Sequence, residues 1–223
     1  MDKKNVSEKK HRIINNKDLK IIIVGDSGTG KTSFINRYIL DQFEATYQVT
    51  IASQLSSKLL KIDDITYRLQ FWDIAGQDRS PETTKYFTKD TKGIIICFEV
   101  NNNKTKENTL KWKNSLEQNL DLKNIPIIIV ENKCDLLGET EEDYNKNIEE
   151  LNKFCEDNNM QKCFRTSAKN GYGVEESINY LVREIVKMNN FNDVFLEEES
   201  LRETIALSKT PHYSIRAKKD NCC

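Results

Sequence analysis

An eight-residue segment near the start of the chain holds three of its eight glycines, followed by a lysine and a threonine. This segment, Gly25-Asp26-Ser27-Gly28-Thr29-Gly30-Lys31-Thr32, fits the pattern G-x-x-x-x-G-K-[ST] between an apolar run and a helical one. Glycines let backbone N–H groups turn toward phosphate oxygens, and a following helix N-terminus adds a favourable dipole. Lys31 would reach the outer phosphates, and the Thr32 hydroxyl would coordinate Mg²⁺. We predict a phosphate-binding loop that extends to Ser33; the alternative is an ordinary glycine-rich turn.

A phosphate-binding loop is shared by ATPases, nucleotide kinases and GTPases, so another part of the chain must select the base. The motif Asn132-Lys133-Cys134-Asp135 follows an isoleucine-rich run and would lie at the carboxyl end of a parallel strand, where open α/β sheets bind ligands. There, Asp135 could accept hydrogen bonds from guanine N1–H and the 2-amino group, while the lysine covers the ring and the asparagine braces the loops. Backbone N–H groups of Ser167-Ala168-Lys169 could bond guanine O6. Each motif alone could be a solvated loop, but their order favours guanine.

Short β-rich runs alternate with longer amphipathic runs, and the apolar runs are continuous, which indicates parallel strands buried on both faces. Strands are predicted at Leu19–Val24, Leu69–Asp73, Gly93–Val100, Ile125–Glu131 and Lys162–Thr166. Helices are predicted at Lys31–Leu40, Thr105–Asn119, Tyr144–Asn158 and Val174–Met188. Residues 53–60 and 67–71, joined by 61–66, predict an antiparallel hairpin. The predicted class is therefore an α/β P-loop NTPase, with a mostly parallel six-stranded sheet, one antiparallel edge strand and helices on both faces.

Composition excludes several classes of protein. A length of 223 residues suits one domain with tails, and we interpret residues 1–17 as a flexible extension, 18–189 as the nucleotide-binding domain and 190–223 as a tail. The 34 basic and 35 acidic residues give a net charge of −1, so nucleic acid is not an expected partner. No apolar run approaches the roughly 20 residues that span a bilayer, and residues 1–20 are polar and basic without the apolar segment of a signal peptide. Four single cysteines are expected to be reduced: Cys97, Cys134, Cys155 and Cys163.

The motifs together resemble the Ras superfamily in their order and spacing. The set comprises Gly25–Thr32, Thr50, Trp72-Asp73-Ile74-Ala75-Gly76-Gln77 and the two base-binding motifs. The Gly-Asp-Ser-Gly start of the first loop, the Trp-Asp pair and the terminal Cys222-Cys223 are most similar to the Rab GTPases. Ile74, together with the cysteine of the N-K-C-D motif, resembles the branch linked to lysosome-related organelles. The resemblance covers Leu19–Met188 and implies a small G domain.

The resemblance also implies roles for residues near the γ-phosphate. Thr50 would ligate Mg²⁺ beside Thr32, and Asp73 would hold a Mg²⁺-bound water. Gly76 N–H would contact the γ-phosphate, and Gln77 would be the catalytic residue that orients the attacking water for hydrolysis of GTP to GDP and phosphate. Phe43 falls where the family places an aromatic against guanine; the alternative is a core or interface phenylalanine. No arginine finger is evident, so we expect slow intrinsic hydrolysis by a monomer that needs a GTPase-activating protein, an exchange factor and effectors.

Two segments depart from the Rab pattern. Ala52 and Leu55 stand where Rabs usually have glycine and phenylalanine, and Ser80, Pro81 and Thr83 remove the usual apolar face of the second switch. Pro81 also fixes φ and removes a backbone donor. The nucleotide residues are kept, so these changes are expected to alter partner choice. The alternative is drift on a seldom-used surface.

The last two residues match the Rab arrangement in which both cysteines receive geranylgeranyl groups. Two chains anchor firmly because each buried CH₂ contributes about 0.8 kcal/mol; the alternative is two free thiols. We therefore expect a molecular switch in vesicle traffic, at the cytoplasmic face of an intracellular membrane with a cytosolic pool. A second hypothesis is a nucleotide-holding scaffold with little turnover. A phosphotransferase is disfavoured because no arginine-rich lid follows the phosphate loop.

Overall fold

The computed structural model describes residues 17–46, 50, 53–62, 64–76, 85, 87–138 and 141–189. Contacts divide the chain into two units at Ile185, and the fold that follows is that of the first unit. Its labelled helices and strands are β1 (Lys17–Val24), α1 (Lys31–Leu40), β2 (Gln54–Ile62), β3 (Ile65–Asp73), β4 (Gly93–Glu99), α3 (Asn103–Glu117), β5 (Ile127–Asn132), α4 (Glu141–Asp157) and β6 (Lys162–Arg165). A further helix covers residues 174–189, of which 174–185 belong to this unit.

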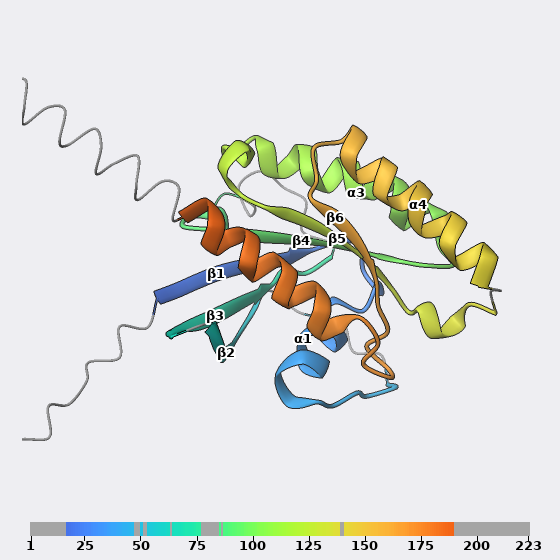
Figure 1. The fold of residues 1–223 in the computed structure, drawn as a ribbon, viewed down its shortest axis with the longest axis horizontal. Helices are drawn as coiled ribbons and strands as arrows, with labels where there is room; N and C mark the ends of the chain where they lie inside the picture. Colours follow the sequence, from blue (N-terminus) through green and yellow to red (C-terminus); the bar gives the residue numbers. More distant parts are fainter. Residues whose placement is uncertain are drawn as a thin grey trace, which may run out of the picture. The chain divides into compact units, whose positions relative to one another are not determined.

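Among the described residues, six strands form one sheet in the order β2-β3-β1-β4-β5-β6 (Figure 1). β3, β1, β4, β5 and β6 run parallel, and β2 pairs antiparallel with β3 at the edge. The hairpin closes at the pair Ile62 and Ile65, so its turn is shorter than predicted. The predicted fold class is confirmed.

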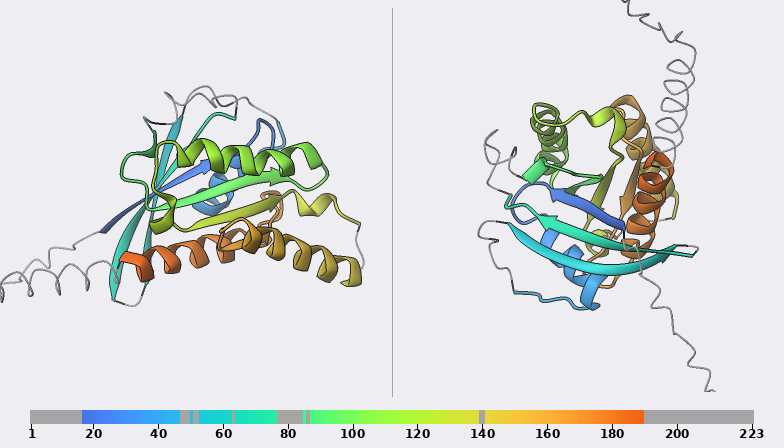
Figure 2. Two further views of the ribbon diagram at one scale, coloured as in Figure 1. Left: turned by 90° about the horizontal axis from the view of Figure 1, so that it is seen from above. Right: turned by 90° about the vertical axis from the view of Figure 1, so that its left-hand side faces the viewer.

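Helices cover both faces of this sheet (Figure 2). On one face, buried isoleucines of β1, β4 and β5 pack with Trp112 and Leu116 of α3 and Leu151 of α4. On the other face, Tyr38 of α1 meets Phe71 of β3 edge-on, with ring centroids 5.6 Å apart. Strands buried on both faces explain why their sequences are continuous apolar runs rather than alternating ones. They also bring the carboxyl ends of β1, β4, β5 and β6 to one edge.

Most predicted boundaries lie within two or three residues of the observed ones. α1 has the predicted bounds, whereas β1 begins at Lys17. α3 begins at Asn103, two residues before the predicted Thr105. The Thr105 hydroxyl donates to the carbonyl of Asn102, 2.7 Å away, and accepts from the N–H of Glu99. Thr105 therefore ties the first turn of the helix to the end of β4 and does not mark its start.

The described residues also bear on two expectations from composition, the absence of a membrane-spanning helix and the presence of free cysteines. No helix among the described residues is both long and apolar enough to cross a bilayer. The predicted free thiols are confirmed for Cys97, Cys134, Cys155 and Cys163, of which all but Cys134 are buried.

Candidate functional site

The loop after β1 is shaped by three glycines with positive φ angles. These angles are 144° at Gly25, 82° at Gly28 and 88° at Gly30, a region that L side chains rarely adopt. At Gly25, a Cβ would also collide with the backbone carbonyl of Cys97. α1 starts at Lys31, and the N–H groups of its first turn have no acceptor within the helix. A glycine-shaped turn that leads into a helix N-terminus is the arrangement that binds phosphate oxygens in proteins.

A cavity of about 260 Å³ lies at this loop. Ten predicted residues line it, namely Ser27, Gly28, Gly30, Lys31, Thr32, Ser33, Phe43, Thr50, Gly76 and Lys133. Five more lining residues were not predicted, namely Asn36, Gln42, Glu44, Ala45 and Thr46. Helical spacing could have identified Asn36, one turn after Thr32 on α1. The other four lie between α1 and Thr50, so the chain that connects two predicted site residues must itself pass the cavity.

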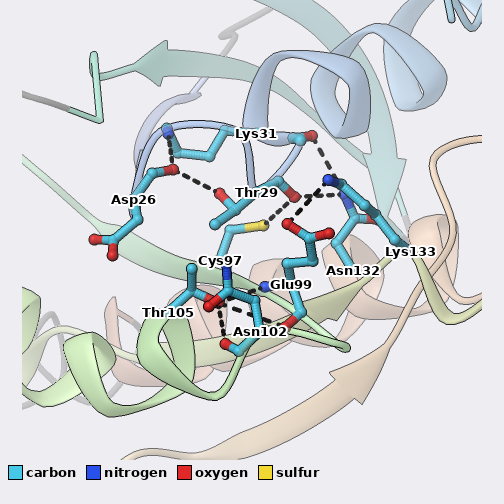
Figure 3. A network of polar contacts seen from close by, with 10 residues as sticks. Asp26, Thr29, Lys31, Cys97, Glu99, Asn102, Thr105, Asn132 and Lys133 are labelled. Carbon is cyan, nitrogen blue, oxygen red and sulfur yellow. Dashed lines mark hydrogen bonds and ion pairs between the residues drawn. The ribbon is translucent and has the colours of Figure 1, made fainter. Parts of the chain in front are cut away.

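The Lys31 ammonium is buried inside the loop (Figure 3). It donates to the carbonyls of Gly25 and Asp26 over 2.9 and 3.0 Å. Both acceptors are neutral, and a phosphate oxygen would be a stronger acceptor for the same ammonium. Lys31 is thus already held where the outer phosphates of a nucleotide would lie.

Asp26 and Thr29, both predicted to bind nucleotide, form hydrogen bonds that connect the loop to α3 and to Asn132. The Asp26 carboxylate accepts from the side-chain amide of Asn108 (2.6 Å) and the indole N–H of Trp112 (2.9 Å), both on α3. Thr29 is buried, and its hydroxyl donates to the Asp26 carbonyl, 3.0 Å away. Its own carbonyl accepts from the side-chain amide of Asn132 over 2.9 Å (Figure 3). These hydrogen bonds hold the loop in its curved conformation, and neither Asp26 nor Thr29 lines the cavity.

Two threonine hydroxyls and one buried carboxylate meet beside the phosphate loop. The Oγ1 atoms of Thr32 and Thr50 lie 2.9 Å apart, and the Thr32 hydroxyl also donates to Asp73 Oδ2. Asp73 is 2% exposed, and its burial raises its pKa, against the opposing effects of the Thr32 hydrogen bond and the Lys31 charge. Its Oδ1 atom is buried without a hydrogen-bond partner among the described residues.

This donor set fits Mg²⁺. Hard divalent cations prefer hydroxyl and carboxylate oxygens, and Mg²⁺ usually keeps several waters and phosphate oxygens besides one or two protein ligands. Within the described ranges no group of three or more His, Cys, Asp or Glu side chains could hold a metal by itself. A Mg²⁺ ion held by Thr32, Thr50 and Asp73 would complete its coordination with waters and phosphate oxygens.

The base-binding motifs follow β5 and β6, which pair in parallel. Asp135 Oδ1 accepts from the Ser167 hydroxyl over 2.6 Å, and the Lys169 ammonium lies 3.8 Å from Asp135 Oδ2. Asn132 Oδ1 accepts from the Ala168 N–H over 3.2 Å. These hydrogen bonds join the loops into one wall, although only Lys133 of the two motifs reaches the cavity lining.

Lys133 adopts a left-handed conformation, with φ 67°. Its ammonium pairs with Glu99 Oε2 at 3.1 Å, at the end of β4 (Figure 3). This leaves the aliphatic stem free to cover a planar ring. Glu99 was not predicted, because nothing local to it indicates a partner more than thirty residues away.

Two further predicted residues contact the cavity from other segments. The Gly76 backbone lies against the phosphate loop so closely that a Cβ would come within 2.6 Å of the Asp26 carbonyl carbon. Phe43 lines the cavity and is 37% exposed. Leu55, in β2, is exposed opposite Trp72. The remaining predictions lie outside the described residues: Ala52, Gln77, Ser80, Pro81, Thr83, Cys222 and Cys223.

The fold and the site define a class of protein, the P-loop nucleotide-binding domains with a small-G-domain sheet. The Ras family model matches residues 20–187. The chain is 33% identical to Ras-related protein Rab-32 of Homo sapiens over 195 residues, which is 82% of the chain and 85% of that protein. It is 38% identical to Ras-related protein Rab-32A of Dictyostelium discoideum over 180 residues, 78% of the chain and 79% of that protein. Identity to Ras-related protein Rab-7L1 of Homo sapiens is 31% over 179 residues, 78% and 85% of the two chains.

The chain therefore belongs to the Ras family and, within it, to the Rab GTPases of the Rab-32 branch. The predicted resemblance is confirmed. Family membership makes the protein a small GTPase switch that binds GTP and GDP and hydrolyses GTP. Its partners are those of the family: guanine nucleotide, exchange factor, activating protein and effectors.

Proposed function

We propose that this Rab GTPase is a Mg²⁺-dependent switch in vesicle trafficking, tethered as a monomer to the cytoplasmic face of an intracellular membrane, with a cytosolic pool. The observation that carries the Mg²⁺-dependent part is the contact of the Thr32 and Thr50 hydroxyls beside the buried Asp73 carboxylate. Thr32 belongs to the phosphate loop, whereas Thr50 belongs to the segment after α1. Ligands at this point would hold the two segments together and so couple the nucleotide state to the surface of the protein.

In the proposed site, the loop backbone and Lys31 bind the phosphates, and Asp135 accepts two guanine N–H groups. Thr32, Thr50 and Asp73 would hold Mg²⁺, which supplies charge neutralisation at the β- and γ-phosphates when bound. Gly76 N–H would contact the γ-phosphate, and Gln77 would orient the attacking water. Catalysis is then positioning and electrostatic stabilisation rather than covalent chemistry.

Substitution of Asp135 by asparagine tests the base site. An amide replaces one acceptor by a donor, so Asp135→Asn should lose guanine nucleotide and gain xanthine nucleotide, whose 2-oxo group accepts a hydrogen bond. Competition of GDP and XDP for the Mg²⁺-loaded protein measures this preference. Asp121→Asn is the matched control, because Asp121 is the exposed N-cap of a short 3-10 helix (Leu122–Asn124) and an asparagine there can still accept from the Lys123 N–H. An unchanged preference in the Asp135 variant would show that the base lies elsewhere.

Membrane tethering rests on Cys222 and Cys223, which would each carry a prenyl group. Two chains give stable attachment where one gives only marginal binding. The test is flotation of the geranylgeranylated full chain with liposomes. The doubly substituted Cys222→Ser, Cys223→Ser protein should stay at the bottom of the gradient, and co-flotation of that variant would contradict the proposal.

A further inference from the structure

The guanidinium of Arg37, on α1, forms hydrogen bonds to two segments: the loop Ser167-Ala168-Lys169 and the turn at Asp41. Arg37 itself is not among the residues that line the nucleotide cavity. Its Nε atom donates to the carbonyl of Ala168 over 2.8 Å, and its Nη2 atom donates to the carbonyl of Lys169 over 2.7 Å. Its Nη1 atom donates to the carbonyl and the carboxylate of Asp41, over 3.0 and 2.8 Å. The Arg37 side chain is 16% exposed. Its hydrogen bond to Ala168 is partly buried, whereas those to Lys169 and Asp41 lie at the surface.

The two carbonyls belong to the S-A-K loop (Ser167-Ala168-Lys169), and fixing them fixes the opposite sides of their peptides. A trans peptide is planar, so its C=O and N–H point in opposite directions. When Arg37 holds the Ala168 carbonyl, the N–H of Lys169 is turned away from α1. Holding the Lys169 carbonyl likewise orients the N–H of Asn170, which donates to the Ser167 hydroxyl over 3.3 Å. That hydroxyl in turn donates to Asp135.

The contact of Arg37 with Asp41 connects α1 to the segment before Thr50 as well. Asp41 ends α1 in a left-handed conformation, φ 54°, and its N–H donates to the Arg37 carbonyl over 3.1 Å. The next two residues, Gln42 and Phe43, line the cavity. Since α1 itself begins at Lys31, one side chain connects the phosphate-binding helix to both segments expected around the base.

We propose that Arg37 is a positioning residue that sets the residence time of the guanine nucleotide. It holds the S-A-K loop and the Asp41 turn on α1, so the base cannot leave by outward movement of either segment while these bonds persist. The inference rests on the proposed function, because it assumes that the S-A-K loop and Asp135 bind guanine. Arginine is suited to this task since its planar fork binds two carbonyls at once, which a lysine ammonium does not reproduce.

Release of a fluorescent GDP from the Mg²⁺-loaded full chain tests the proposal. Arg37→Met and Arg37→Lys should both release it about tenfold faster than wild type, a change equivalent to about 1.4 kcal/mol. Arg68→Met is the matched control: Arg68 pairs with Asp18 on the exposed surface of β1 and β3, and its loss should leave release unchanged. The lysine variant keeps the charge beside Asp41, so it also decides the question if the methionine variant does not fold.

A chemical double-mutant cycle separates positioning from general loosening. In 6-thio-GDP, the O6 acceptor is replaced by sulfur, a weaker acceptor. The affinity lost on this replacement should be smaller in Arg37→Lys than in wild type, because the donors of the S-A-K loop are no longer held in place. Wild-type release by Arg37→Lys, or an unchanged sulfur penalty, overturns the proposal. If the wild-type protein showed no preference for guanine nucleotide, that result would instead contradict the proposed base site.

Discussion

Replacing Arg165 with methionine should destabilise the domain strongly, because Arg165 shares a buried ion pair with Glu131. The pair joins Arg165, the last residue of β6, to Glu131, the last residue but one of β5, and the two side chains are only 3% and 7% exposed. The Thr166 N–H also donates to the Glu131 carbonyl over 2.8 Å, immediately before the S-A-K loop. The substitution removes the countercharge but leaves the Glu131 carboxylate inside the protein.

The magnitude follows from that burial. Breaking a buried pair by removing one partner costs about 3–5 kcal/mol, whereas replacing both by apolar residues is often close to neutral. A domain has a total stability of about 5–15 kcal/mol. Arg165→Met and Glu131→Leu should therefore each remove a large part of the free energy of unfolding, and the double variant should recover most of it.

Urea unfolding, followed by circular dichroism at one fixed excess of GDP, measures these free energies. The nucleotide concentration must be held constant because a ligand that binds only the folded state adds to its apparent stability. The surface pair of Arg68 and Asp18, with side chains 48% and 44% exposed, is the control and should change stability by about 0–1 kcal/mol. Single variants that lose less than about 1 kcal/mol, or effects that simply add in the double variant, would refute the reasoning.

Three shorter predictions concern the phosphate loop and its surroundings. Asp73→Asn should raise the melting temperature in EDTA by about 2–4 °C, since ~1 kcal/mol of buried-charge cost is removed, and should lower it below wild type with Mg²⁺ and GDP; scanning calorimetry measures both. Gly25→Ala should abolish GDP binding in a titration, because its Cβ meets the Cys97 carbonyl, whereas Gly28→Ala has open space around its Cβ and should lose only the contribution of a strained φ, about 1–3 kcal/mol. Burial raises the pKa values of Cys97 and Cys134 to about 11, so both thiols stay protonated at pH 8; iodoacetamide labelling, resolved by peptide mass spectrometry, should be slow there and rise toward pH 11 at the half-buried Cys134.

Each of these expectations has an opposing result. Equal melting temperatures of the Asp73 variant and wild type in EDTA would mean that the carboxylate is not costly to bury. Equal loss in the two glycine variants would assign the effect to φ alone, and Gly138→Ala, at an open position without positive φ, controls for both. Labelling of Cys134 at pH 8 as fast as a free thiol would contradict its raised pKa.

Local sequence patterns predicted the fold because the central strands can be identified from their own residues alone. Strands buried on both faces need continuous apolar runs, and such runs predicted the three central parallel strands β1, β4 and β5. Both ends of α1 were predicted correctly, and its start is fixed by the phosphate loop that precedes it. The start of α4 was missed by three residues, since Glu141-Glu142 is an acidic stretch without apolar spacing.

The residues of the candidate site likewise fall into those that local motifs predicted and those that only tertiary packing reveals. Motif residues lie directly after strands, so once the strands are parallel they must gather at one edge of the sheet. Arg37 and Glu99 could not be found this way, because their partners at Ala168, Lys169 and Lys133 are set by tertiary packing. The sequence shows such residues only as an ordinary charged helix position and an ordinary strand end.

The attachment of Asp26 to Trp112 gives the protein a built-in optical probe. The chain has two tryptophans. The Trp112 indole N–H is bound to the back of the phosphate loop, while Trp72 lies next to Asp73, packed against Phe87 and under the Lys20 ammonium. Rearrangement of the loop would alter the surroundings of one indole, and rearrangement near Asp73 those of the other. Single Trp→Phe variants would then let ultraviolet emission follow each event separately, in unlabelled protein and in real time.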